Sequence, residues 1–167
     1  MSQKNRNVSL AALIAALYVV LTFLSNAFGM ASGMIQVRIS EALCILPIFT
    51  PWAIPGLTLG CFFSNLLTGC ALPDIIFGTF ATLMGAVGTY YLRSYRFLSP
   101  LPPIVANTVI IPFVLRYAYH LTEALPFMML TVGAGEVISC GVLGIALMLA
   151  ITPMKDRLFP SDQGRPT

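Results

Sequence analysis

An uncharged run from Ala42 to Pro73 limits what this chain can fold into more than any other feature of the sequence. Residues 8–28 form a second apolar stretch without a charge. Charged residues make up 9% of the chain and hydrophobic residues 57%, whereas a typical soluble domain has about 25% charged residues. A soluble protein of this length could not bury so much apolar surface, so lipid must be the solvent for much of it. The sequence therefore predicts an all-α membrane protein.

Prolines and glycines divide the apolar stretches into six predicted spans. Pro47, Pro51 and Pro55 interrupt the long uncharged run, and we place a break at "TPWAIPG" because proline ends or kinks a helix. We expect the spans at residues 8–28, 39–50, 53–69, 74–92, 102–119 and 126–152. This organisation predicts an N-terminal segment over residues 1–7, a six-transmembrane-helix bundle over 8–152 and a polar tail over 153–167.

Six spans place both termini on one side of the membrane, and the basic residues indicate which side. Cytoplasmic loops of membrane proteins are enriched in lysine and arginine. If both termini are cytoplasmic, only Arg38 and Arg116 of the nine basic residues lie outside. The other seven are Lys4, Arg6, Arg93, Arg96, Lys155, Arg157 and Arg165. We therefore expect a multi-pass protein of the cell membrane with both termini in the cytoplasm.

The remaining composition excludes several functions. The net charge is only +3 and the basic residues are scattered, which argues against nucleic-acid binding. The four cysteines lie in apolar runs without a CxxC pair, and the chain has one histidine, so we expect no metal site. The sequence has no GxxxxGKS/T phosphate loop and no known nucleophile motif. We therefore expect no ATP hydrolysis by that route and no catalytic residues.

Carboxylates gather in the half of the predicted bundle that faces outwards. Outside the C-terminal tail they are Glu41, Asp74, Glu123 and Glu136. Glu136 lies deepest, roughly 15 Å along the last span. An ionisable group at this depth is costly and usually functional, although a structural ion pair or a protonated glutamate between helices is the alternative. The small residues of "VGAGEVISC" around it would let another element approach closely.

Arg38 and Glu41 stand together just before the uncharged run, in "IQVRISEAL". One interpretation is a helix end, with Ser40 as its cap, Glu41 near the positive end of the helix dipole and Arg38 reaching lipid headgroups. The other interpretation is a binding site. The predicted topology favours the site, because this stretch faces the same outer rim as the other intramembrane polar groups.

Other polar residues have similar alternatives. Asn65 and Asn107 lie within predicted spans, where either interhelical hydrogen bonding or ligand binding would explain them. We interpret Asp74 as a residue that stabilises a helix start. A solvated helix end and loop would explain Arg116, His120 and Glu123.

The first span carries an alanine-rich face. Ala11 with Ala15, and Ala12 with Ala16, form two overlapping pairs of small residues four positions apart. Such faces permit close helix packing in lipid, and packing within the bundle is one explanation. Because the face lies at the cytoplasmic end, far from the polar groups, we predict instead a docking face for a partner.

These segments together resemble a known family. The alanine-rich first helix, the six spans and the outer polar residues are similar to the S components of energy-coupling factor (ECF) transporters. More narrowly, "IQVRISEAL", "TPWAIPGLTLGCFFSNLLTG", "DIIFGTFATL", "LPPIVANTVI" and "GAGEVISC" resemble the QueT family. The resemblance implies a six-helix S-component fold with an outward-facing site for a queuosine precursor, a 7-deazaguanine base. It also implies a membrane coupling subunit and two ATPase subunits as partners, which use the ATP, so that this chain needs no cofactor.

The chemistry of such a substrate suits the outer polar residues. A guanine-like edge offers adjacent N–H donors that one carboxylate accepts in parallel, and an aminomethyl side group, if present, would require a second acid. Phe28 or Tyr117 would stack on the flat base. Glu136 either contacts the base or, being deep, supports a residue that does. The predicted substrate-binding residues are Gln36, Arg38, Glu41, Asn65, Asn107 and Glu136.

Two other functions remain open from the sequence. The chain could be an integral-membrane enzyme with Glu136 and His120 as acid and base, or a solitary carrier with Glu136 as its proton site. Turnover of a substrate by the purified protein would indicate the enzyme. Uptake driven by a proton gradient without ATPases would indicate the carrier.

Overall fold

The computed structural model describes residues 3–30 and 36–159, and every regular element in this part of the chain is a helix. The all-α prediction is thus confirmed for these residues; Arg165, used in the orientation argument, lies outside them. A 3-10 helix, η1 (Ile39–Ile48), a π-helix, η2 (Val137–Leu143), and a short 3-10 turn, η3 (Thr152–Met154), accompany the α-helices. The α-helices are α1 (Gln3–Ala27), α2 (Ala53–Leu67), α3 (Leu72–Tyr91), α4 (Leu101–Ala118), α5 (Leu125–Glu136), α6 (Gly144–Ile151) and α7 (Lys155–Leu158).

Each of the six predicted spans coincides with helical structure. The largest boundary shift is at the first helix, which begins at Gln3 rather than at residue 8. Four helices, α1, α3, α4 and the continuous helix Leu125–Met154, are long and apolar enough to cross a membrane. The two remaining helices, η1 and α2, are shorter. At their usual rise per residue they extend roughly 20 and 22 Å, less than the ~30 Å hydrocarbon core.

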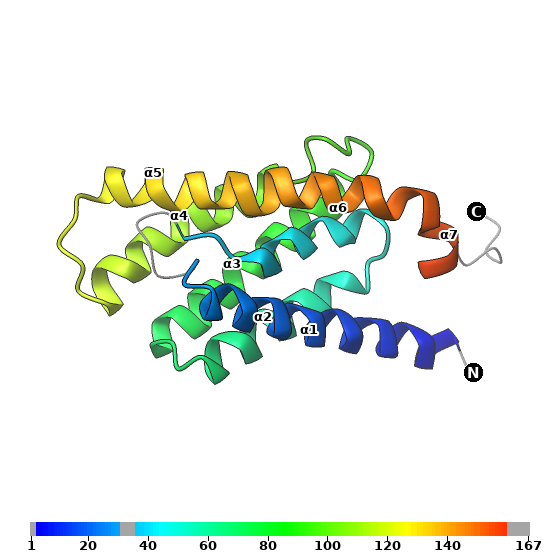
Figure 1. Cartoon of the computed structure of the whole chain (residues 1–167), viewed down its shortest axis with the longest axis horizontal. Helices are drawn as coiled ribbons and strands as arrows, with labels where there is room; N and C mark the ends of the chain where they lie inside the picture. Colours follow the sequence, from blue (N-terminus) through cyan, green and yellow to red (C-terminus); the bar gives the residue numbers. More distant parts are fainter. Residues whose placement is uncertain (1–2, 31–35, 160–167) are drawn as a thin grey trace.

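The short helix η1 runs through the middle of the bundle. All of its residues from Ser40 to Pro47 are buried, and it packs against α1, α3, α6 and η2. Figure 1 shows it between α1 and the long helix formed by α5, η2 and α6. Pro47, which has no N–H to donate, lies near its end. The 3-10 form is unusual at this length and places residues three positions apart on the same face.

Glycines let α1 and α2 pack closely. A Cβ atom added at Gly56 would lie 2.7 Å from the carbonyl oxygen of Ala11, and one at Gly60 would lie 3.1 Å from Cα of Ala15. Half of the predicted docking face is therefore in contact with α2 in the same chain. The other two alanines of that face, Ala12 and Ala16, are exposed.

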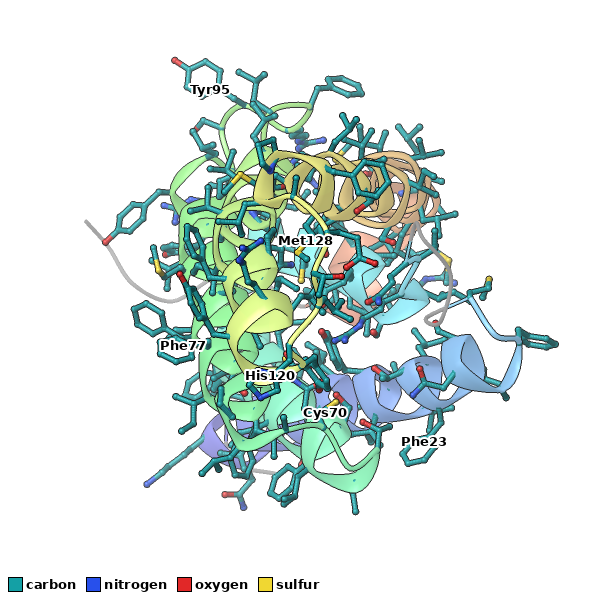
Figure 2. The ribbon with its side chains drawn as sticks, turned by 90° about the vertical axis from the view of Figure 1, so that its left-hand side faces the viewer. Phe23, Cys70, Phe77, Tyr95, His120 and Met128 are labelled. Atoms are coloured by element: carbon teal, nitrogen blue, oxygen red, sulfur yellow. The ribbon has the colours of Figure 1, made fainter. Side chains whose placement is uncertain are left out.

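The two ends of the bundle differ. The start of α1 and helix α7 lie at one end, and the α2–α3 and α4–α5 turns lie at the other (Figure 1). Figure 2 looks onto this second end, with Cys70 and His120 of the two turns towards the viewer. In the same view Phe23 and Phe77 project outwards from the bundle, where lipid would surround them.

Candidate functional site

A small cavity lies inside the bundle, between segments that are distant in the sequence. Its volume is about 30 Å³, which is room for about two water molecules. Five of the six predicted substrate-binding residues line it, and the sixth, Asn65, contacts Arg38. The complete lining is Gln36, Arg38, Glu41, Cys61, Gly78, Thr82, Asn107, Ile111, Val132 and Glu136.

Arg38 reaches into the bundle rather than towards lipid headgroups. Its Nη1 donates to the side-chain oxygen of buried Asn65, 3.4 Å away. Gly78 leaves room for this arrangement, since a Cβ there would lie 3.1 Å from Nδ2 of Asn65 and 3.3 Å from Oδ1 of Asp74. Asp74 is buried in the first turn of α3 and is the carboxylate with the strongest electrostatic effect on Arg38. Glu41 of η1 also interacts electrostatically with Arg38, so carboxylates of both α3 and η1 compensate its charge.

A tyrosine just beyond α4 supports Asp74. The hydroxyl of Tyr119 donates to Oδ2 of Asp74 at 2.9 Å and accepts the N–H of Ala71 at 3.1 Å. Partial burial, together with the nearby carboxylate, raises the pKa of Tyr119 above the ordinary tyrosine value. The hydroxyl therefore stays protonated at neutral pH and continues to donate. Asp74 thus has a tertiary contact in addition to its favourable position at a helix start.

Helix α1 anchors η1 through a line of buried hydroxyl groups. The line consists of Tyr18, Thr22 and Ser25, which share one face of the helix because they are four and three positions apart. Sequence reasoning missed it, although this spacing of hydroxyl residues in an apolar span is a usable signal. Ser40 lies inside η1 and accepts one of these bonds, so its interpretation as a cap is wrong. The bonds join Tyr18 to Glu41, Thr22 to Ser40 at 2.9 Å and the Ile39 N–H to Ser25 at 2.8 Å.

Both carboxylate oxygens of Glu41 accept a hydrogen bond. Its side chain is only 3% exposed. Tyr18 donates to Oε1, and the thiol of Cys44, one 3-10 turn further along η1, donates to Oε2 at 3.1 Å. A buried carboxylate needs such donors because burial removes its water. Glu41 therefore enters the cavity wall in a fixed orientation.

Glu136 ends α5 and contributes a second carboxylate to the cavity. The thiol of Cys140 donates to its Oε2 at 3.3 Å, and Asn107 of α4 makes a further side-chain hydrogen bond with it. Next to it, a Cβ added at Gly135 would overlap the carbonyl oxygen of Gln36. The close approach predicted from the small residues around Glu136 is therefore confirmed, and it brings α5 against the stretch that precedes η1.

Several residues considered from the sequence lie away from the cavity. Phe28 and Tyr117, expected to stack on a base, are 72% and 69% exposed and do not line it. That expectation is wrong for the structure as it stands, because both side chains face the surroundings. His120 is exposed and does not meet Glu136, so the two do not form an acid–base pair. Arg116 donates to the carbonyl oxygen of Glu123 at 3.0 Å, as expected in a solvated loop.

Comparisons with known proteins identify the family of the chain. A family described as "QueT transporter" matches residues 8–153. A curated relative, the "Queuosine precursor transporter QueT" of Lactococcus lactis subsp. cremoris (strain MG1363), is 36% identical over 81 residues, which are 48% of this chain and 47% of the relative. The aligned region thus spans about half the length of that protein. No solved structure matches the chain. Because the family match covers residues 8–153, the chain belongs to the QueT transporter family, and its long apolar helices are those of a multi-pass membrane protein.

Proposed function

We propose that this chain is the substrate-binding (S) subunit of an ATP-driven ECF importer and that it captures a queuosine precursor in the cavity. The observation that carries the proposal is the convergence of Gln36, Arg38, Glu41, Asn107 and Glu136 on one cavity. These residues come from three separate parts of the chain, which are the stretch 36–41, α4 and α5. Placing so many polar groups together inside a membrane protein is costly unless they bind a ligand or form hydrogen bonds with one another.

The lining suits a 7-deazaguanine base. Glu136 accepts the paired N–H donors of the guanine-like edge, and Asn107 beside it reads a carbonyl or ring nitrogen. Among the described residues, the lining contains two carboxylates, Glu41 and Glu136, and one cationic side chain, Arg38. A second acid is what an aminomethyl group on the base would require. Asn65 holds Arg38 in position.

Binding requires a wall of the cavity to move. A volume of about 30 Å³ is far below the ~300 Å³ at which ligand pockets usually begin. The 3-10 helix η1 and the π-helix η2 are the irregular elements next to the cavity, and such segments often mark hinges or functional sites. We expect a shift at one of them to admit the base.

The same proposal includes the arrangement of the chain in the membrane and its partner subunits. All six helices cross the membrane, with the two short helices shielded by the longer ones, and both termini are cytoplasmic. The exposed Ala12 and Ala16 form the docking face for a membrane coupling subunit, while Ala11 and Ala15 pack on α2. Two ATPase subunits bind the coupling subunit and use the ATP, so this chain requires no cofactor.

Calorimetric titration of the purified protein with 7-deazaguanine bases tests the site. Replacing Glu136 by Gln keeps the shape but exchanges one acceptor oxygen for an NH2 group, so the side chain can no longer accept two N–H groups and affinity should fall by about 1–3 kcal/mol. Glu123→Gln is the matched control, because Glu123 is exposed in the α4–α5 loop. Unchanged affinity in Glu136→Gln would remove Glu136 from the site, and no binding of any deazaguanine by the wild-type protein would refute the proposed substrate.

A solitary carrier remains the second candidate. The observation that favours it is the position of two carboxylates, buried Glu41 and partly buried Glu136, against one cavity. Uptake into vesicles driven by a proton gradient, without ATPase subunits, would support it. Co-purification with a coupling subunit that is lost in Ala16→Leu would support the ECF assembly instead.

A further inference from the structure

Three buried side chains and one partly buried side chain, all able to bind a metal, meet beside the cavity. Glu41 and Cys44 come from η1, and one oxygen or sulfur atom from each lies within 4.8 Å of the sulfur of Cys140 in η2. All three residues are buried. Glu136 adds a fourth group, since its Oε2 is 3.3 Å from the same sulfur atom.

Helix geometry explains why these four groups point to one place. Glu41 and Cys44 are three positions apart in a 3-10 helix, where residues i and i+3 lie on the same face. Glu136 and Cys140 are four positions apart where α5 continues into η2, so they also share a face. The elements η1 and η2 pack directly on each other. Each helix therefore presents one carboxylate and one thiol to the other.

The spacing fits a tetrahedral metal site. Zinc binds thiolate sulfur at about 2.3 Å and carboxylate oxygen at about 2.0–2.2 Å, so neighbouring ligand atoms lie roughly 3.3–3.8 Å apart. The sulfur of Cys44 is 3.1 Å from Oε2 of Glu41, and that of Cys140 is 3.3 Å from Oε2 of Glu136. The ligand atoms of Glu41, Cys44 and Cys140 lie within 4.8 Å of one another, so small side-chain movements would place these three around one ion. Glu136 would be the fourth ligand through its contact with Cys140.

Charge and chemistry favour a soft divalent cation. Two carboxylates and two thiols lie together in the bundle, and the one cationic side chain among the described residues of the cavity lining, Arg38, donates its hydrogen bond to Asn65 rather than to either carboxylate. A divalent ion would compensate buried negative charge, and sulfur ligands favour zinc over magnesium or calcium. We propose that Glu41, Cys44, Glu136 and Cys140 form a site for a soft divalent cation of the zinc type. The site has no CxxC spacing because its two ligand pairs lie far apart in the chain.

The site has a consequence for transport that rests on the proposed function. Glu41 and Glu136 are also the carboxylates that we assign to the substrate. One carboxylate cannot hold a metal ion and the donor edge of a base at the same time, so the cation and the queuosine precursor should exclude each other. The coupling must be reciprocal, with each ligand weakening the other by the same factor.

Cadmium titration tests the metal site without any substrate. Cadmium bound to thiolates absorbs in the ultraviolet, so the purified wild-type protein should develop this absorption and saturate at one ion per chain. Cys44→Ser and Cys140→Ser should each reduce the absorption and weaken binding at least tenfold. Cys70→Ser is the matched control and should behave as wild type, because Cys70 lies in the α2–α3 turn, outside the cluster.

Two results would overturn the proposal. One is the absence of saturable sulfur-to-cadmium absorption in the wild-type protein, and the other is equal absorption in the Cys44→Ser/Cys140→Ser double variant. If the double variant does not fold, X-ray absorption spectroscopy of cadmium bound to the wild-type protein replaces it. The proposal requires two sulfur atoms in the first coordination shell of the ion, and fewer would refute it. The competition experiment is separate. A metal site with no effect on precursor affinity would refute mutual exclusion, and a chain that binds metal but no precursor would refute the proposed function alone.

Discussion

The two acidic walls of the cavity are held in place by different means. On the η1 wall, hydrogen bonds from Tyr18 and Cys44 fix the carboxylate of Glu41, and further bonds tie η1 to the hydroxyl line of α1. On the α5 wall, Cys140 also donates a hydrogen bond to Glu136, but the backbone beside this carboxylate is placed by a steric contact. Gly135, which has no side chain, lies directly against the carbonyl oxygen of Gln36.

This difference indicates how the site could combine fixed geometry with movement. The η1 wall is preorganised, so its groups lose little freedom when a ligand binds. The α5 wall continues into the π-helix η2, a form often found at functional sites. Because the cavity must enlarge to take a base, we expect the α5 wall to be the part that shifts. Variants that disturb one wall at a time can test this contrast.

The largest effect should come from filling the contact at Gly135. In Gly135→Ala the new Cβ meets the backbone of Gln36 rather than a flexible side chain, so α5 must move away. We expect a loss of about 3 kcal/mol in the free energy of unfolding, at the upper end of overpacking effects. Titration with sodium dodecyl sulfate in mixed micelles measures it.

Gly141→Ala is the control for that variant. It lies in η2, where the nearest atom to an added Cβ is 3.8 Å away, an ordinary contact distance. The control should keep wild-type stability within about 0.5 kcal/mol. Equal stability of both variants would mean that the glycine contact does not hold the α5 wall.

A smaller effect should follow from disturbing the η1 wall. Tyr18→Phe removes a buried donor to Glu41 and leaves the carboxylate partly unsatisfied. We expect a loss of about 1–2 kcal/mol of stability, together with weaker substrate binding because Glu41 loses its fixed orientation. Tyr95→Phe, at a tyrosine that is 65% exposed, should change neither quantity. If Tyr18→Phe were as stable as wild type, the hydroxyl line would not be an anchor.

The positions of the helices could be predicted from the sequence, but their types could not. Proline, glycine and charge mark where apolar segments end, and Pro47, Pro51 and Pro55 placed the boundary between η1 and α2 correctly. The 3-10 form of η1 and the π form of η2 depend on neighbouring elements that a linear pattern does not contain. Helix length then separates four candidate spans from two short helices, which composition alone did not do.

The sequence predicts which residues lie in the same half of the bundle, because that depends only on topology. It does not predict which of their side chains face the cavity, because that depends on the rotation of each helix about its axis. Gln36, Arg38 and Glu136 were expected together because all lie in the outer half of the bundle. Phe28 and Tyr117 lie in the same half, but their side chains face outwards, which depends on the rotation of each helix about its axis. The same rotation turns Tyr18 inwards, where it meets Glu41.

The smallest effect should come from Tyr119, which supports the η1 wall from the side of α3. Tyr119→Phe removes the hydrogen bond to Asp74, whose charge compensates Arg38. Because Tyr119 is 39% exposed, water can partly replace the bond, and we expect a loss of no more than about 1 kcal/mol of stability.

The stability contribution of Tyr119 should also depend on pH. The pKa of Tyr119 is raised in the folded protein, so its contribution is complete below the ordinary tyrosine pKa of about 10 and declines as the pH rises towards the folded-state value. The stability difference between wild type and Tyr119→Phe should therefore be constant near neutral pH and shrink in strongly alkaline solution. A difference that grew with pH would contradict the role of this hydroxyl as a donor to Asp74.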